Sequence, residues 1–173
     1  MKNKFYSLIL TIVFSVTGAF ASVFEHPAKI SDISDKIPKF ESINCSFKQE
    51  KKLKNIEKPL ISEGNFSFVK DKGVYFETLI PIKSTVSYTN KDYKQINDIV
   101  LAISKRKYSK LDNEFEFFFI NSDNIWELGL RPKKTSNTED FINSIYITGS
   151  DYINKINIDL KNGNNTTIWF TKK

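Results

Sequence analysis

The chain has 173 residues, of which 40% are hydrophobic and 27% are charged, and its formal net charge is +6 at pH 7. This length and composition fit one globular domain and exclude an intrinsically disordered chain. Lysines and acidic residues are interspersed, so the clustered basic face of a nucleic-acid binder is missing. Because Cys45 is the only cysteine, an internal disulfide is excluded and stability must come from the core.

Residues 1–21 have the pattern of an export signal. Lys2 and Lys4 precede an apolar run, which ends in the small-x-small pattern of a signal-peptidase site. The run is about sixteen residues long, whereas a membrane-spanning helix needs roughly twenty, so a cleaved signal is favoured over an anchor. We therefore expect cleavage before Ser22, leaving a mature domain over residues 22–173 that is soluble in the periplasm. Its net charge is about +4.

Sequence patterns typical of catalytic sites are nearly absent, and only a pair of the scattered Asp and Glu residues meeting in the folded chain is left open. His26 is the only histidine and follows the expected cleavage site closely, in a segment that we expect to be mobile. Neither a Ser-His-Asp arrangement nor a histidine-based zinc site can therefore be assembled. None of the glycines belongs to a GxxxxGK[ST] phosphate-binding loop. The sequence predicts a protein that is not an enzyme and has no metal or cofactor.

Two segments have helical periodicity. In residues 28–37, isoleucines recur at positions 30, 33 and 37, which predicts a short amphipathic helix that ends at Pro38. The second helix is the clearer one, because Ile96, Ile99, Val100 and Ile103 follow an i, i+3, i+4, i+7 pattern.

The remaining segments alternate between apolar and polar residues, which is typical of half-buried strands in an antiparallel sheet. Nine strands are expected, one at 43–53, three within 61–90, a hairpin at 115–130, and others at 144–148, 155–160 and 166–171. In residues 61–90, one parity is apolar and should face the second layer of the fold. It consists of Phe66, Phe68, Val74, Phe76, Ile82, Val86 and Tyr88.

The order and spacing of several short motifs resemble a known family. In the first half these are F-x-Q-x-K, S-x-G-x-F and G-x-x-F-x-T-x-x-P, at Phe47, Gln49, Lys51, Ser62, Gly64, Phe66, Gly73, Phe76, Thr78 and Pro81. In the second half the matching residues are Leu111, Phe115, Trp126, Leu128, Leu130, Pro132 and Lys133. Together they are similar to the pattern of LolA-like periplasmic carriers of outer-membrane lipoproteins, over most of the mature chain.

The resemblance implies a mainly β (α+β) fold, in which a single strongly curved antiparallel sheet forms an incomplete β-barrel covered by short amphipathic helices as a lid. The concave face would hold the acyl chains of a lipoprotein or another acylated lipid. The donor would be an inner-membrane exporter and the acceptor would lie at the outer membrane. We expect the carrier to be a monomer.

Apolar residues on the inward parity of the strands are the candidates for binding the acyl chains. They are Phe47, Phe66, Phe68, Val74, Phe76, Val86, Tyr88, Phe117, Trp126, Leu128, Ile145, Ile156, Ile158 and Ile168. The candidate lid residues come from the two helices. They are Ile30, Ile33, Ile96, Ile99, Val100 and Ile103. Phe76 is expected to point into the cavity.

Two departures from the family pattern leave alternatives open. Lys70 stands where the carriers have an arginine, and Phe76 stands where they have a tryptophan, so an arginine-dependent lid latch is in doubt. Such features also resemble smaller LolA-like proteins associated with the export of glycolipids or other acylated products. A different class of protein, an exported β-rich interaction domain, predicts a filled core in place of a cavity.

Overall fold

The protein forms a single open sheet of ten antiparallel strands. The computed structural model describes residues 22–69, 72–87 and 94–172. The strand order is β1-β6-β7-β8-β9-β10-β2-β3-β4-β5, so β1 and β5 lie at the two edges. The predicted open antiparallel sheet with few helices is confirmed.

The strands are β1 (Pro27–Ala28), β2 (Ser42–Lys52), β3 (Leu60–Val69), β4 (Gly73–Ile80), β5 (Ser84–Ser87), β6 (Phe115–Ser122), β7 (Ile125–Pro132), β8 (Ile142–Gly149), β9 (Ile153–Leu160) and β10 (Asn165–Lys172). The helices are α1 (Ile30–Ile33), α2 (Lys94–Lys105) and α3 (Ser109–Glu114), with 3-10 turns η1 (Val23–Glu25) and η3 (Asn137–Asp140). None of the helices in the described ranges has the length and hydrophobicity that crossing a bilayer requires.

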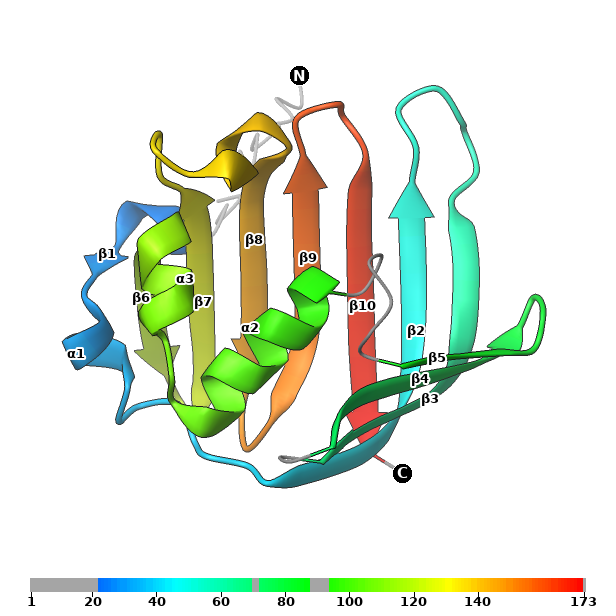
Figure 1. The fold of residues 1–173 in the computed structure, drawn as a ribbon, viewed down its shortest axis with the longest axis horizontal. Coiled ribbons are helices and arrows are strands. Elements are labelled where there is room, and N and C mark those ends of the chain that lie inside the picture. The colour runs from blue at the N-terminus through cyan, green and yellow to red at the C-terminus, as the bar shows by residue number, and fades with distance from the viewer. Residues whose placement is uncertain (1–21, 70–71, 88–93, 173) are drawn as a thin grey trace, which may run out of the picture.

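Two layers are visible in Figure 1. The helices α2 and α3 lie across one face of the sheet, which we call the inner face, and α2 crosses in front of β8, β9 and β10. The sheet curves so that β4, β5 and the end of β3 run at a steep angle to β7, β8 and β9. The curvature lets one short helix cover the apolar residues of several strands.

A close backbone approach accompanies this curvature in β3. The pairing of β3 with β4 shifts register between Glu63 and Gly64. A Cβ atom on Gly64 would lie 1.9 Å from the backbone oxygen of Glu77, so no other residue fits this position without displacing β4. Glycine is common where a strand bends or two backbones approach closely.

The first predicted helix is shorter than the sequence pattern indicates. The α-helix covers only Ile30–Ile33, and the chain then continues through a turn before Ile37. The isoleucines nevertheless point inward as the pattern predicts, because Ile33 and Ile37 are both fully buried. A short helix has little intrinsic stability, so packing of its isoleucines determines where it ends.

The segment around His26 was expected to be mobile, and this prediction is wrong. Phe24 packs on the outer face of the sheet against Phe118, and the guanidinium of Arg131 lies 5.0 Å and 4.9 Å from the two ring centroids. Gly129 makes room for this contact, since a Cβ there would lie 2.8 Å from the Phe24 ring. The segment then joins the sheet as β1, which pairs with β6 and is the strand that the sequence pattern missed.

The predicted signal peptide falls outside the described residues, so the cleavage site stays a prediction.

Candidate functional site

The inner face of the sheet brings the predicted cargo residues together. Every one of them whose side chain the structure describes is buried and belongs to a single hydrophobic cluster. These are Phe47, Phe66, Phe68, Val74, Phe76, Phe117, Trp126, Leu128, Ile145, Ile156, Ile158 and Ile168. For Val86 only the backbone is described, and it pairs with Phe76. Tyr88 lies outside the described residues.

Strand register explains why these residues meet. A continuous aliphatic row crosses β7, β8, β9 and β10. In this row Leu128 pairs with Ile147, Ile147 pairs with Ile156, and Ile156 pairs with Ile168. Cross-strand neighbours on one face of a sheet are close enough for direct packing. The row belongs to the same buried cluster as the apolar residues of α2.

An aromatic group fills the part of the inner face formed by β2, β3, β4 and β10. The ring centroid of Phe66 lies 4.9 Å from that of Phe76 and 4.6 Å from that of Phe170. Phe47 meets Phe76 edge to face at 5.1 Å. Edge-to-face pairs of this kind add to the stability that comes from burial alone.

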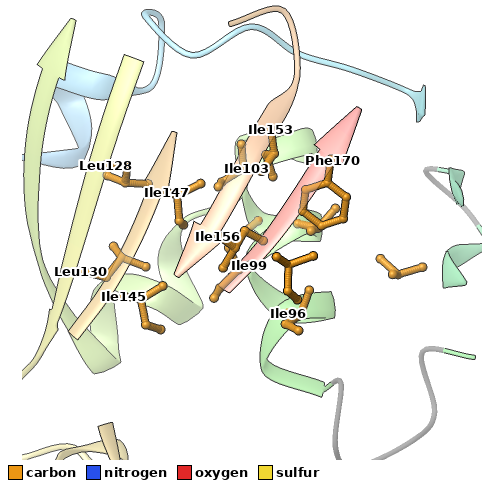
Figure 2. Close-up of a cluster of buried hydrophobic side chains, with 14 of the residues drawn as sticks. Ile96, Ile99, Ile103, Leu128, Leu130, Ile145, Ile147, Ile153, Ile156 and Phe170 are labelled. Carbon is orange, nitrogen blue, oxygen red and sulfur yellow. The ribbon is translucent and has the colours of Figure 1, made fainter. Parts of the chain in front are cut away.

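The predicted lid residues of α2 contact this surface. Ile96, Ile99, Val100 and Ile103 are buried in the same cluster as the strand residues. Figure 2 shows the first, second and fourth of them among Ile145, Ile156 and Phe170 of the sheet. From α1, Ile33 is also buried in the cluster, and Ile30 packs against it while partly exposed. The residues predicted from strand alternation and those predicted from helical spacing thus meet at one interface.

The environment of Phe76 differs from the one expected. Its side chain points to the inner face as predicted, but only 1% of it is exposed, and the rings of Phe47 and Phe66 pack against it. Phe76 therefore contacts other side chains and does not line an open cavity. Its burial is that of a core residue.

Ile82 was assigned to the inward apolar parity, and that assignment is wrong. It follows the end of β4 in the turn before β5, and 76% of it is exposed. The alternation of buried and exposed residues applies only while the strand continues, so it cannot place a residue in a turn.

Sequence reasoning missed several residues of the same cluster. They include Phe40, Ile43, Ala102, Tyr108, Ile142, Ile147, Ile153 and Phe170. Three of them, Ile43, Ile147 and Phe170, continue an inward parity that the predicted strands already had, so a complete reading of the alternation could have found them. Ile142 and Ile153 have the opposite parity to Ile145 and Ile156, because β8 and β9 change register between them. Tyr108 had no such signal, because it lies between α2 and α3, and α3 was not predicted.

Three buried polar side-chain atoms in the described part of the chain have no hydrogen-bond partner. They are Oδ1 of Asn97, Nε of Arg106 and the hydroxyl of Tyr108. All three belong to α2 or to the link between α2 and α3. An unpaired buried polar group costs about 1–3 kcal/mol, so this cost is concentrated on the helical layer.

Arg106 fastens the end of α2 to the segment that follows α1. Its guanidinium donates to the carboxylate of Asp35 at 3.0 Å and to the backbone oxygen of Ile37 at 3.1 Å. The Asp35 side chain is exposed, so the ion pair itself contributes little. The contact nevertheless joins the two helices that were predicted to form the lid. Lys70, the position of the expected latch, lies outside the described residues.

A cleft of about 610 Å³ opens at the β1 edge of the sheet. It lies between β1, α1, α3 and the start of β6, and its charged lining residues are Lys29, Asp112, Glu116 and Lys133. Of the predicted site residues, Ile30 and Phe117 reach it. The mixed charges give the cleft no preference for an ion of one sign.

Replacing Tyr108 by phenylalanine should leave the free energy of unfolding unchanged or raise it by about 1 kcal/mol, because the lost hydroxyl is buried and unpaired. Burial raises the pKa of Tyr108 to about 12, whereas an unfolded tyrosine ionises near pH 10. The wild-type protein should therefore lose about 1.4 kcal/mol per pH unit through this group between pH 10 and pH 12. Denaturant titrations at pH 7 and pH 11 should show a smaller alkaline loss for Tyr108→Phe.

Tyr146 is the matched control, because its hydroxyl donates to the carboxylate of Glu127 at 2.7 Å. Tyr146→Phe should therefore lower stability at pH 7 by about 1 kcal/mol, opposite in sign to Tyr108→Phe. Equal losses from the two substitutions would mean that the Tyr108 hydroxyl has a partner.

Comparison of the sequence with protein-family models and with curated proteins found no match. Among solved structures, the LolA superfamily protein NE2245 from Nitrosomonas europaea aligns with 83% of this chain and 90% of its own chain. The TM-score is 0.32 and the sequence identity is 9%. A likeness at this level does not establish a family.

Proposed function

We propose that the protein is a periplasmic carrier that holds the acyl chains of a lipoprotein between α2 and the inner face of the sheet. It would receive the lipoprotein from an inner-membrane exporter and release it to an acceptor at the outer membrane, without catalysing a reaction. The motif order of the sequence supports a lipoprotein as cargo. The observation that carries the proposal is that the unpaired buried polar atoms all lie in α2, which covers the apolar face, or in the link that follows it.

The energies of cargo binding and of lid closure are comparable. Burial of a sixteen-carbon chain is worth about 12 kcal/mol, at about 0.8 kcal/mol per methylene. Burial of four apolar side chains stabilises the closed helix by roughly 6–12 kcal/mol in total, at about 1.5–3 kcal/mol for each side chain. These side chains are Ile96, Ile99, Val100 and Ile103. Cargo that displaces α2 therefore gains little net free energy, which allows it to be released.

The unpaired polar atoms lower the cost of opening further. When α2 leaves the sheet, Oδ1 of Asn97 becomes accessible to water and forms the hydrogen bond that it lacks in the closed arrangement. Each such group returns about 1–3 kcal/mol on hydration. The helix is thus held mainly by apolar contacts that an acyl chain can replace.

A fluorescent fatty-acid titration tests this function. The wild-type protein should bind the probe saturably, and Asn97→Leu should bind it about tenfold more weakly, because removing the unpaired amide stabilises the closed helix. Asn121→Leu, at an exposed position of β6, is the control and should leave the affinity unchanged. Unchanged or tighter binding by Asn97→Leu would contradict competition between helix and cargo.

A second function is favoured by the packing of the interior. The predicted cargo residues contact one another and α2, as in an ordinary protein core, which fits an exported interaction domain. Native mass spectrometry of protein purified from envelope extract separates the two functions. Added acyl-chain mass would support the carrier and would also distinguish a lipoprotein from a glycolipid, whereas a protein that neither retains lipid nor binds the probe would support the interaction domain.

A further inference from the structure

Exposed apolar residues are concentrated at one corner of the molecule. Six of the nine large hydrophobic residues that the described ranges expose lie between positions 56 and 61 or between 79 and 82. We call this group the apolar corner. It consists of Ile56, Leu60, Ile61, Leu79, Ile80 and Ile82. Hydrophobic residues that gather in one exposed place, instead of being scattered, indicate an interaction site.

The sheet brings the two segments together. Glu63 of β3 pairs with Ile80 of β4, so the first residues of β3 lie beside the end of β4. Figure 1 shows the loop between β2 and β3 and the turn between β4 and β5 at the same end of the molecule, away from α1 and β1. The register shift between Glu63 and Gly64 lies next to this corner, because Glu63 is the residue that pairs with Ile80.

The charges around the apolar corner are mostly positive. Residues 51–63 and 79–84 contain five lysines but only two acidic residues, Glu57 and Glu63. The lysines are Lys51, Lys52, Lys54, Lys58 and Lys83. The ion pairs recorded between described residues involve none of the five. Their charge is therefore available to an anionic surface.

The composition of the corner favours a bilayer over a protein partner. Its two segments contain isoleucine, leucine, proline and lysine but no aromatic residue and no arginine. Protein interfaces usually rely on tyrosine, tryptophan and arginine for their strongest contacts. Aliphatic side chains flanked by lysines instead suit the boundary between acyl chains and anionic headgroups, which needs no specific geometry.

We propose that the apolar corner docks the protein on the surface of an anionic phospholipid bilayer. The aliphatic side chains enter the headgroup region, and the lysines lie at the level of the lipid phosphates. This surface is separate from the inner face of the sheet, so docking does not require that the protein carries acyl chains.

Co-sedimentation with vesicles of phosphatidylcholine, with and without one third phosphatidylglycerol, tests the docking. The exported form of the protein should bind the anionic vesicles, and high salt should weaken the binding. Ile80→Asp should lower the partition coefficient about tenfold, because it places a carboxylate at the headgroup boundary. Lys58→Glu should lower it about fivefold or more, since each lysine near such a surface contributes about that factor.

The controls are matched in exposure and chemistry. Ile125 is 53% exposed against 54% for Ile80 but lies at the start of β7, and Lys107 is an exposed lysine beyond α2. Ile125→Asp and Lys107→Glu should bind the vesicles as the wild-type protein does. The proposal is overturned if the wild-type protein ignores anionic vesicles or if Ile80→Asp and Ile125→Asp weaken binding equally. It is also overturned if light scattering shows that the corner joins two copies of the chain and Ile80→Asp separates them without changing vesicle binding.

Discussion

Replacement of Phe76 by glutamate is expected to unfold the domain. The side chain is 1% exposed and packs between the rings of Phe47 and Phe66, so a carboxylate there has no water and no partner. Burying an unpaired charge costs several kcal/mol, a large part of the roughly 5–15 kcal/mol that stabilises a domain of this kind. Thermal unfolding followed by circular dichroism should show a large fall in Tm or no cooperative transition.

The sequence analysis expected Phe76 to point into a cavity, and in that position the same substitution would give a folded protein unable to bind acyl chains. Ile125→Glu is the control, because the same change at a half-exposed strand position should alter stability by less than about 0.5 kcal/mol. A Phe76→Glu protein that remains folded would show that water reaches this side chain, and its inner face would then be open in solution.

Truncation of Ile99 to alanine should loosen α2 more than it loosens the sheet. Ile99 is buried between α2 and the inner face, and an isoleucine-to-alanine change in such a site costs about 2–5 kcal/mol. If α2 opens on its own, that cost falls on the opening of the helix. Amide hydrogen exchange in α2 should then become at least about thirtyfold faster, while exchange in β8, β9 and β10 changes little.

Ile147→Ala is the matched control, because it removes the same atoms from the sheet side of the interface. Ile147 is fully buried in β8, within the aliphatic row beneath α2. Its truncation should lower the stability of the strands as well as the helix. If the two variants accelerate exchange over the same residues, α2 is part of one cooperative core. That result would favour an exported interaction domain over a carrier.

The sequence by itself determined most strands and the main helix. The alternation in residues 61–80 predicted β3 and β4 and assigned Phe66, Phe68, Val74 and Phe76 to one face, and the structure buries all four. The helical spacing of Ile96, Ile99, Val100 and Ile103 likewise identified the buried side of α2. These properties follow from local geometry, since the direction of a side chain repeats every second residue in a strand and every 3.6 residues in a helix.

Only the tertiary structure decided which segments meet. Residues 27–28 form a strand because β6 offers an edge to pair with, and two residues are too few to show a period. The contact of Arg106 with Asp35 joins positions far apart in the chain, and no local pattern announces it. The helix α3 is only six residues long and has a single buried side chain, so its periodicity could not be recognised.

The tertiary structure also decided how the apolar residues are used. A parity pattern says which side chains point to the same face, but not whether that face is empty or covered. Packing of α2 and of the phenylalanine rings fills the space around Phe76, whereas the ends of β3 and β4 leave Ile80 and Ile82 without cover. Whether an apolar residue is buried therefore depends on the curvature of the sheet and on the length of the helix above it, and neither property is contained in the local alternation.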